Sequence, residues 1–96
     1  MEAPVISTDV LARYAGDAAV EVEGVSGLTR DAAHVVGTAE KADVTVHLEL
    51  EWGAAAEDVS RRVQERVAEY LERMANLEVG SVDVVVERVG APPAKQ

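Results

Sequence analysis

The chain has 96 residues, enough for one domain built around a single hydrophobic core. Eighteen acidic and nine basic residues give a formal net charge of -9, which disfavours binding to phosphate backbones and anionic membrane surfaces unless a basic patch is set apart. Because the sequence contains no cysteine, disulfides, thiolate metal sites and a cysteine nucleophile are excluded.

The first predicted element is a helix over residues 7–23. Apolar side chains recur there at steps of three and four residues, as they do on the buried side of an amphipathic helix. Ser7 or Thr8 is placed to cap its first turn, and Gly24 is placed to end it in a left-handed conformation. Gly16 costs the helix about 1 kcal/mol relative to alanine unless close packing against a neighbour requires a glycine.

The stretch from Gly24 to Lys41 is the least regular part of the chain, with one short candidate strand near residues 32–36. Residues 43–52 are much clearer, because apolar and polar side chains alternate from Val44 to Trp52. This pattern predicts a strand with one buried and one solvent-facing side, and it places Trp52 in the core.

A second helix is predicted over residues 55–75, with Met74 on its buried side and acid-before-base pairs four residues apart on its outer face. Residues 79–89 alternate again and form the last strand, while the tail 91–96 contains two adjacent prolines and is expected to be disordered. We therefore expect one α/β (α+β) domain over residues 1–90, of order α-β-β-α-β. Two helices would cover one face of a small three-stranded sheet.

Catalytic constellations are not evident in the sequence. The four serines, Ser7, Ser26, Ser60 and Ser81, lie outside any nucleophile-elbow motif, and the two histidines stand apart from each other. Walker and Rossmann glycine patterns are also absent. We expect a protein that is not an enzyme and that has no catalytic residues and no cofactor.

The best metal candidate is His47 with Glu49 and Glu51, because their spacing places all three side chains on one face of the predicted strand. His34 could join them only if the two strands pair. The same alternation is typical of any solvent-facing strand, and side chains along one strand form a line rather than a tetrahedron. Our expectation is therefore no metal site.

Two other features can be read in a structural or a functional way. Gly24 to Gly27 has the Gly-x-x-Gly spacing of RNA-binding KH domains, but Glu21 and Glu23 flank it where such a loop carries basic residues. Two glycines that turn the chain after a helix explain the same pattern. Trp52 could anchor a partner, although its place in the alternation favours core packing.

Two blocks of sequence resemble the alkaline-shock, or general-stress, family of bacterial envelope-stress proteins. The first comprises residues 6–19 (ISTDVLARYAGDAA) and 21–28 (EVEGVSGL). The second runs from Val44 through LEWG at 50–53, VQERV at 63–67 and RMANLEV at 73–79 to VDVVV at 82–86. Together they cover roughly three quarters of the chain. Asn76 stands where the family commonly has a helix-ending glycine, and the stretch 29–41 is shorter than in many members.

This resemblance implies a cytoplasmic protein linked to cell-envelope stress or alkaline tolerance, sometimes held at the inner face of the membrane by a separate membrane-embedded partner. It implies no catalytic residues, and it suggests self-association, for which exposed strands offer a route through their edges or through the solvent-facing side of the sheet. We expect no signal peptide, membrane insertion or nucleic-acid partner. A KH-like nucleic-acid-binding domain is the alternative, supported only by the Gly-x-x-Gly spacing and the order of elements.

Overall fold

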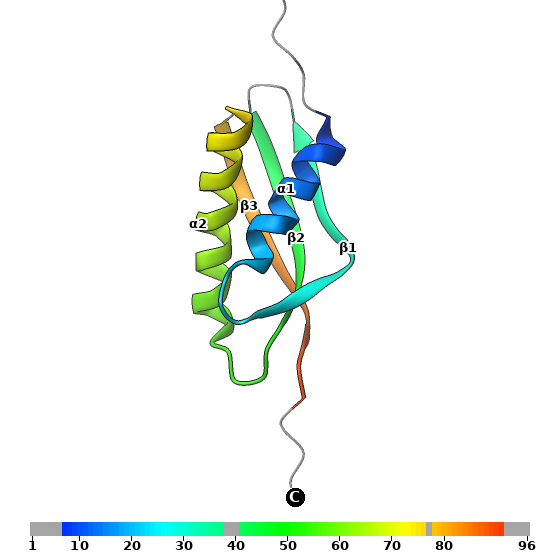
Figure 1. Ribbon diagram of the computed structural model, residues 1–96, viewed down its shortest axis with the longest axis vertical. Helices are drawn as coiled ribbons and strands as arrows, with labels where there is room; N and C mark the ends of the chain where they lie inside the picture. The colour runs from blue at the N-terminus through cyan, green and yellow to red at the C-terminus, as the bar shows by residue number, and fades with distance from the viewer. Residues whose placement is uncertain (1–6, 38–40, 77, 92–96) are drawn as a thin grey trace, which may run out of the picture.

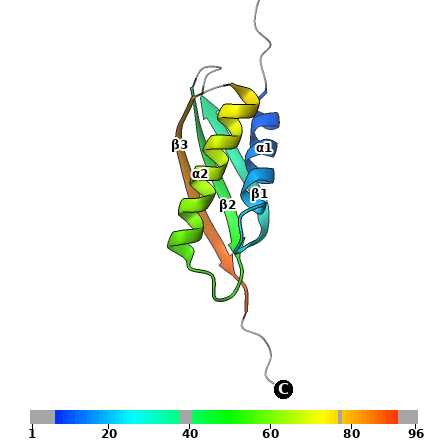
Figure 2. The same cartoon turned by 60° about the vertical axis from the view of Figure 1, so that its left-hand side comes forward.

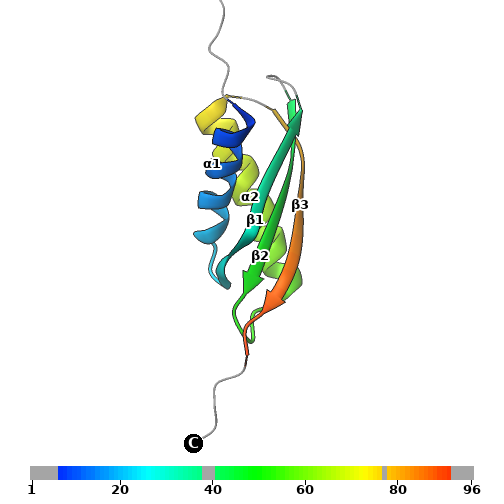
Figure 3. The ribbon, with the colours of Figure 1, turned by 90° about the vertical axis from the view of Figure 1, so that its right-hand side faces the viewer.

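The computed structural model describes residues 7–37, 41–76 and 78–91, and it contains two helices and three strands over these ranges. In chain order they are α1 (Thr8–Val20), β1 (Val25–Gly37), β2 (Lys41–Leu50), α2 (Ala56–Ala75) and β3 (Glu78–Val89). Both helices lie on the same side of the sheet (Figures 1 and 3). The predicted order of elements and the two-layer arrangement agree with this architecture. Of the predicted tail, residues 92–96 lie outside the described residues.

The sheet has the order β1-β2-β3, so β2 is its central strand. β1 runs antiparallel to β2, and β3 runs parallel to β2 after the crossover through α2. Figure 2 shows α2 lying over the sheet beside β3, with α1 next to β1. In the described part of the chain, the sheet therefore has one face covered by helices and one face without a covering layer.

The core lies between the helices and the sheet and consists of short aliphatic side chains. β2 supplies Ala42, Val44, Val46, Leu48 and Leu50, and α2 supplies Val59, Val63, Val67 and Leu71, which recur at helical steps. The buried residues of α1 are mostly small: Leu11, Ala15, Gly16, Ala18 and Ala19. A β-carbon on Gly16 would lie 3.0 Å from Cδ1 of Leu28, so close packing against β1 explains this glycine.

The ends of the two helices agree in part with those predicted from the sequence. Ser7 caps α1 by accepting a hydrogen bond from the amide of Val10 at 3.2 Å, as one of the two predicted caps. The helix ends at Val20 rather than at residue 23, because the amides of Glu21 and Val22 turn back to the carbonyls of Ala18 and Ala19, each only three residues earlier. Asn76 adopts a left-handed conformation (φ 53°) after α2, the role that glycine usually fills.

Three expectations about β1, Trp52 and Met74 were wrong. β1 spans thirteen residues rather than about five, because irregular pairing hides its alternation. Trp52 lies beyond the end of β2 and is 58% exposed, since the chain turns at Gly53 (φ 85°) before the alternation can continue. Met74 lies in the last turn of α2, beyond Leu71, the last buried residue of this helix, and is half exposed.

Candidate functional site

The uncovered face of the sheet, called the open face below, carries the side chains that alternate away from the helices. Those of β1 include His34 and Val36, those of β2 are Lys41, Asp43, Thr45, His47 and Glu49, and those of β3 include Ser81, Asp83, Val85 and Glu87. Val36 is 70% exposed and Val85 is 38% exposed. The open face is therefore mixed in character, with apolar, acidic and imidazole groups side by side.

His47 lies at the centre of a small polar cluster on this face. Its Nδ1 is 2.6 Å from Oε1 of Glu87, and its ring meets that of His34 edge to face with centroids 5.9 Å apart. The three side chains come from three different strands, β2, β3 and β1. This cluster is therefore a product of the sheet pairing and not of proximity in the sequence.

Irregular pairing on both sides of β2 shapes this cluster. Between the pairs Leu28–Leu48 and Ala33–Val46, four residues of β1 face the single residue His47. On the other side, Leu48 pairs with Val86 and Glu49 with Arg88, so Glu87 is an extra residue in β3. Such bulges redirect a side chain relative to a regular ladder, and here Glu87 reaches His47.

The predicted metal candidates do not come together as a group. Within the described ranges, no set of three His, Asp or Glu side chains is placed to hold a metal ion. Glu51 follows the end of β2 and is exposed, so it does not share the strand face with His47 and Glu49. The pairing of β1 with β2, on which a contribution of His34 depended, is present.

The Gly-x-x-Gly segment comprises the turn at Gly24 and the first residues of β1, and it does not join two helices, as the corresponding loop of a KH domain does. Gly24 has φ 102°, and a β-carbon on it would lie 2.8 Å from Cγ2 of Val59 in α2. Gly27 has nothing within 4 Å of the equivalent point. Gly24 thus serves packing and chain reversal, which supports the structural reading of this motif.

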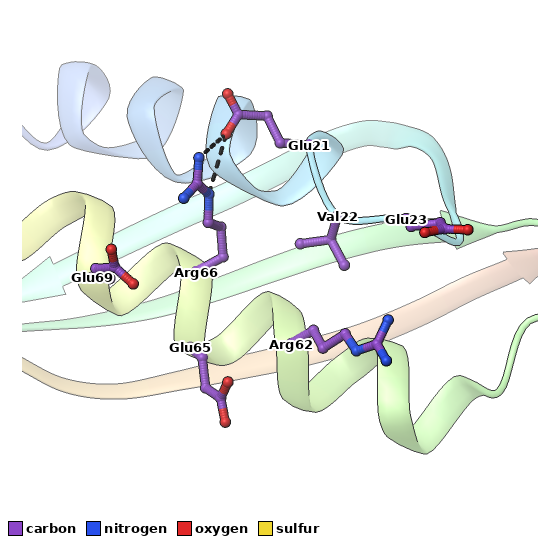
Figure 4. A pocket seen from close by; sticks show the side chains of 7 residues that line it. All are labelled: Glu21, Val22, Glu23, Arg62, Glu65, Arg66 and Glu69. Atoms are coloured by element: carbon purple, nitrogen blue, oxygen red, sulfur yellow. Dashed lines mark hydrogen bonds and ion pairs between the residues drawn. The ribbon is translucent and has the colours of Figure 1, made fainter.

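A charged hollow lies between the end of α1 and the outer side of α2 (Figure 4), where Glu21, Val22, Glu23, Arg62, Glu65, Arg66 and Glu69 surround about 320 Å³. Arg66 bridges the helices through two hydrogen bonds to Oε2 of Glu21, from Nη2 at 2.5 Å and from Nε at 3.2 Å. This hydrogen bonding and the charge of Glu21 raise the pKa of Arg66. The hollow is a site of paired charges, without a nucleophile beside a base.

A second hollow, of about 510 Å³, lies between α2 and the outer edge of β3. Gln64 of α2 reaches across it and donates from Nε2 to the carbonyl oxygen of Val82 at 3.0 Å. This bond occupies a backbone acceptor on an edge strand, a group that could otherwise pair with another strand. Trp52 borders a third, smaller hollow of about 290 Å³ beside Gly24 and Arg62.

The hydroxyl groups of Ser7, Ser26 and Ser81 form hydrogen bonds that support the fold. Ser26 donates to the carbonyl oxygen of Glu49 at 3.0 Å, and Ser81 donates to Oδ1 of Asp43 at 3.1 Å. Within residues 7–37, 41–76 and 78–91, no serine is hydrogen-bonded to a histidine. Neither of the helices over these residues is long and apolar enough to cross a lipid bilayer.

Comparison with known proteins gives a family match and several structural neighbours. Residues 30–91 match the model of the alkaline-shock protein 23 family, which is described as having a cell envelope-related function. No curated protein matches the chain. The matched residues include β2, α2 and β3, together with part of β1, and so contain the whole polar cluster on the open face.

The solved structures that are similar to this chain include three forms of the MamM CTD. A triply substituted variant has a TM-score of 0.66 at 17% identity, and covers 83% of this chain and 93% of its own. The zinc form of a singly substituted variant has a TM-score of 0.68 at 16% identity, and the match covers 86% of this chain and 87% of the variant. The copper form has a TM-score of 0.65 at 15% identity, with 92% of each chain covered. At these identities the likeness concerns the fold alone.

Proposed function

Because this chain belongs to the alkaline-shock protein 23 family, whose function is related to the cell envelope, we propose that it is a non-catalytic interaction domain of the envelope stress response. In this proposal it binds a second copy of itself through the open face and is held at the cytoplasmic side of the membrane by a membrane-anchored protein. The observation that carries the proposal is the sheet face without a covering layer, on which apolar side chains are exposed.

In the described residues no serine is hydrogen-bonded to a histidine, and this supports a binding role. The charged hollow between the helices contains the Arg66–Glu21 ion pair, and the hydrogen bonds of Ser26 and Ser81 go to oxygen acceptors rather than to a histidine base. Nucleophilic catalysis by serine needs its hydroxyl within hydrogen-bond reach of a base. The surface is therefore better suited to contacts with a macromolecule than to chemistry on a small substrate.

The two edges of the sheet are poor routes to self-association. β1 is interrupted by a bulge at its centre, and bulged edges resist pairing with another strand. At β3, Gln64 occupies the carbonyl of Val82. The open face offers Val36 and Val85 on its two outer strands, and a two-fold arrangement would bring these side chains of both copies together.

Charge makes self-association dependent on salt. Each copy has a formal charge of -9, so two copies repel each other at long range. The Debye length falls from about 30 Å at 0.01 M to about 8 Å at 0.15 M salt, so added salt screens this repulsion while leaving apolar contacts in place. We expect the dimer to be stronger at 0.15 M than at 0.01 M salt by this argument.

Sedimentation equilibrium over a range of concentrations and at both salt levels tests this surface. Val85→Glu should shift the chain to the monomer, because it adds a negative charge to a contact between two acidic copies, whereas Val10→Glu on the exposed side of α1 should leave the dimer unchanged. A wild-type chain that remains monomeric at high concentration, or equal behaviour of the two variants, would contradict self-association through the open face.

The membrane partner is tested separately in the native host. A tagged chain is followed through separation of cytosol and membranes, and co-purifying proteins are identified by mass spectrometry. The proposal expects sedimentation with membranes together with one specific membrane protein. A chain that stays in the cytosol and brings down only itself would remove the membrane-anchored partner from the proposal.

A further inference from the structure

We propose that His34 and His47 on the open face bind one divalent first-row transition-metal ion, and that Glu87 orients His47 for this role. All three side chains belong to one chain, so the proposal does not depend on self-association. The cation class is that preferred by imidazole ligands, namely Zn²⁺, Ni²⁺ and Cu²⁺. Water molecules would fill the remaining coordination positions.

The contact between His47 and Glu87 prepares His47 as a ligand. With an ionised carboxylate and a neutral imidazole, the 2.6 Å contact places the proton on Nδ1 of His47 and leaves the lone pair on Nε2. Histidines that bind metals typically donate their other ring N–H to a carboxylate or carbonyl in this way. In the single chain the side chain of His47 is 23% exposed and that of Glu87 46% exposed, which lets an ion approach the monomer from solvent.

His34 lies at a suitable distance to supply the second ligand. With metal–nitrogen distances of about 2.0–2.1 Å, two imidazoles that share one ion have ring centroids about 5–6 Å apart. The centroids of His34 and His47 are 5.9 Å apart with the rings edge to face. His34 is exposed, so rotation of its side chain can turn a ring nitrogen toward the ion without movement of the strands.

The irregular pairing around His47 explains why this cluster is possible. Four residues of β1 face His47 alone, and Glu87 is the extra residue of β3 on its other side. In a regular ladder, alternation would place Glu87 level with the next outward residue of β2, Glu49, and like charges would then face each other. The bulge instead directs the carboxylate to an imidazole.

The direct test is isothermal titration calorimetry of the full chain, without a polyhistidine tag, with Zn²⁺ and with Ni²⁺. We expect one ion per chain. His34→Gln and His47→Gln should each weaken binding at least tenfold, and Glu87→Gln should weaken it about 10- to 100-fold, the usual effect of removing a carboxylate that orients a ligand. Circular dichroism checks that each variant is folded, and these surface changes should leave the spectrum unchanged.

Glu51→Gln is the matched control, because Glu51 is an exposed carboxylate just beyond the same strand and outside the face that carries both rings. It should bind as the wild type does. Electron paramagnetic resonance of the Cu²⁺ complex adds a readout of the ligands themselves, and splitting from two imidazole nitrogens is expected. Absence of binding, oxygen-only coordination, or binding that survives the double variant His34→Gln/His47→Gln would overturn the proposal.

Discussion

Gly24 provides the sharpest test of how the turn between α1 and β1 is built. Its φ of 102° lies in the region that favours glycine, and a β-carbon there would be 2.8 Å from Cγ2 of Val59, a buried residue of α2. The backbone conformation costs an L-residue about 1–2 kcal/mol, and overpacking against a buried side chain costs about 1–3 kcal/mol. Gly24→Ala should therefore lower the free energy of unfolding by roughly 2–5 kcal/mol.

This loss is large for a chain of 96 residues, whose total free energy of unfolding is of the order of 5–14 kcal/mol. The loss is measured by urea denaturation, monitored by far-ultraviolet circular dichroism. The slope of the free energy of unfolding against urea concentration should be the same as in the wild type. Gly27→Ala is the control in the same motif, because Gly27 has no positive φ and nothing lies within 4 Å of an added β-carbon. The free energy of unfolding of this control should lie within about 0.5 kcal/mol of the wild-type value. Equal effects at the two glycines would refute the packing argument.

Three further predictions follow from the core, the end of α2 and the edge of β3. Leu48→Ala removes a side chain with no exposed surface and should cost about 2–5 kcal/mol, measured by the same denaturation. Asn76→Gly should keep or raise the free energy of unfolding, because glycine adopts the left-handed φ of 53° without strain. Asn76→Ala should lower it by about 1–2 kcal/mol, and an alanine variant as stable as the wild type would argue against this cap. Gln64→Ala should lower the free energy of unfolding by about 0.5–1.5 kcal/mol, because the hydrogen bond to Val82 is lost. It also frees the carbonyl of Val82 on the sheet edge, so light scattering should rise as the protein concentration increases. An unchanged scattering curve would mean that the edge is protected in another way.

The elements with a regular period could be predicted from the sequence. β2 alternates without interruption, and α2 repeats its valines every four residues, so both follow directly from side-chain periodicity. β1 could not be predicted at its full length, because its bulge breaks the period of two at the point where four residues face His47. Trp52 illustrates the opposite error, since the alternation of β2 continues in the sequence after the strand itself has ended.

The open-face cluster could be predicted only in part. The sequence places His47 on the solvent-facing side of a strand, and it makes a contribution of His34 conditional on strand pairing. Glu87 carries no local signal, because its contact with His47 spans forty residues and depends on an extra residue in β3. The Arg66–Glu21 contact between the helices, forty-five residues apart, is also beyond what local patterns can indicate.

The small side chains of α1 also determine which substitutions the protein can accept over time. Ala15, Ala18 and Ala19 are fully buried, so the helix backbone lies close to its neighbours and leaves no space for larger groups. At these positions any enlargement pushes the layers apart, whereas at the valines and leucines of β2 and α2 truncation opens a void. A saturation scan should therefore show two opposite size limits within one core. At the buried alanines of α1 we expect only the smallest residues to be accepted, whereas the exposed positions of the same helix should accept larger ones.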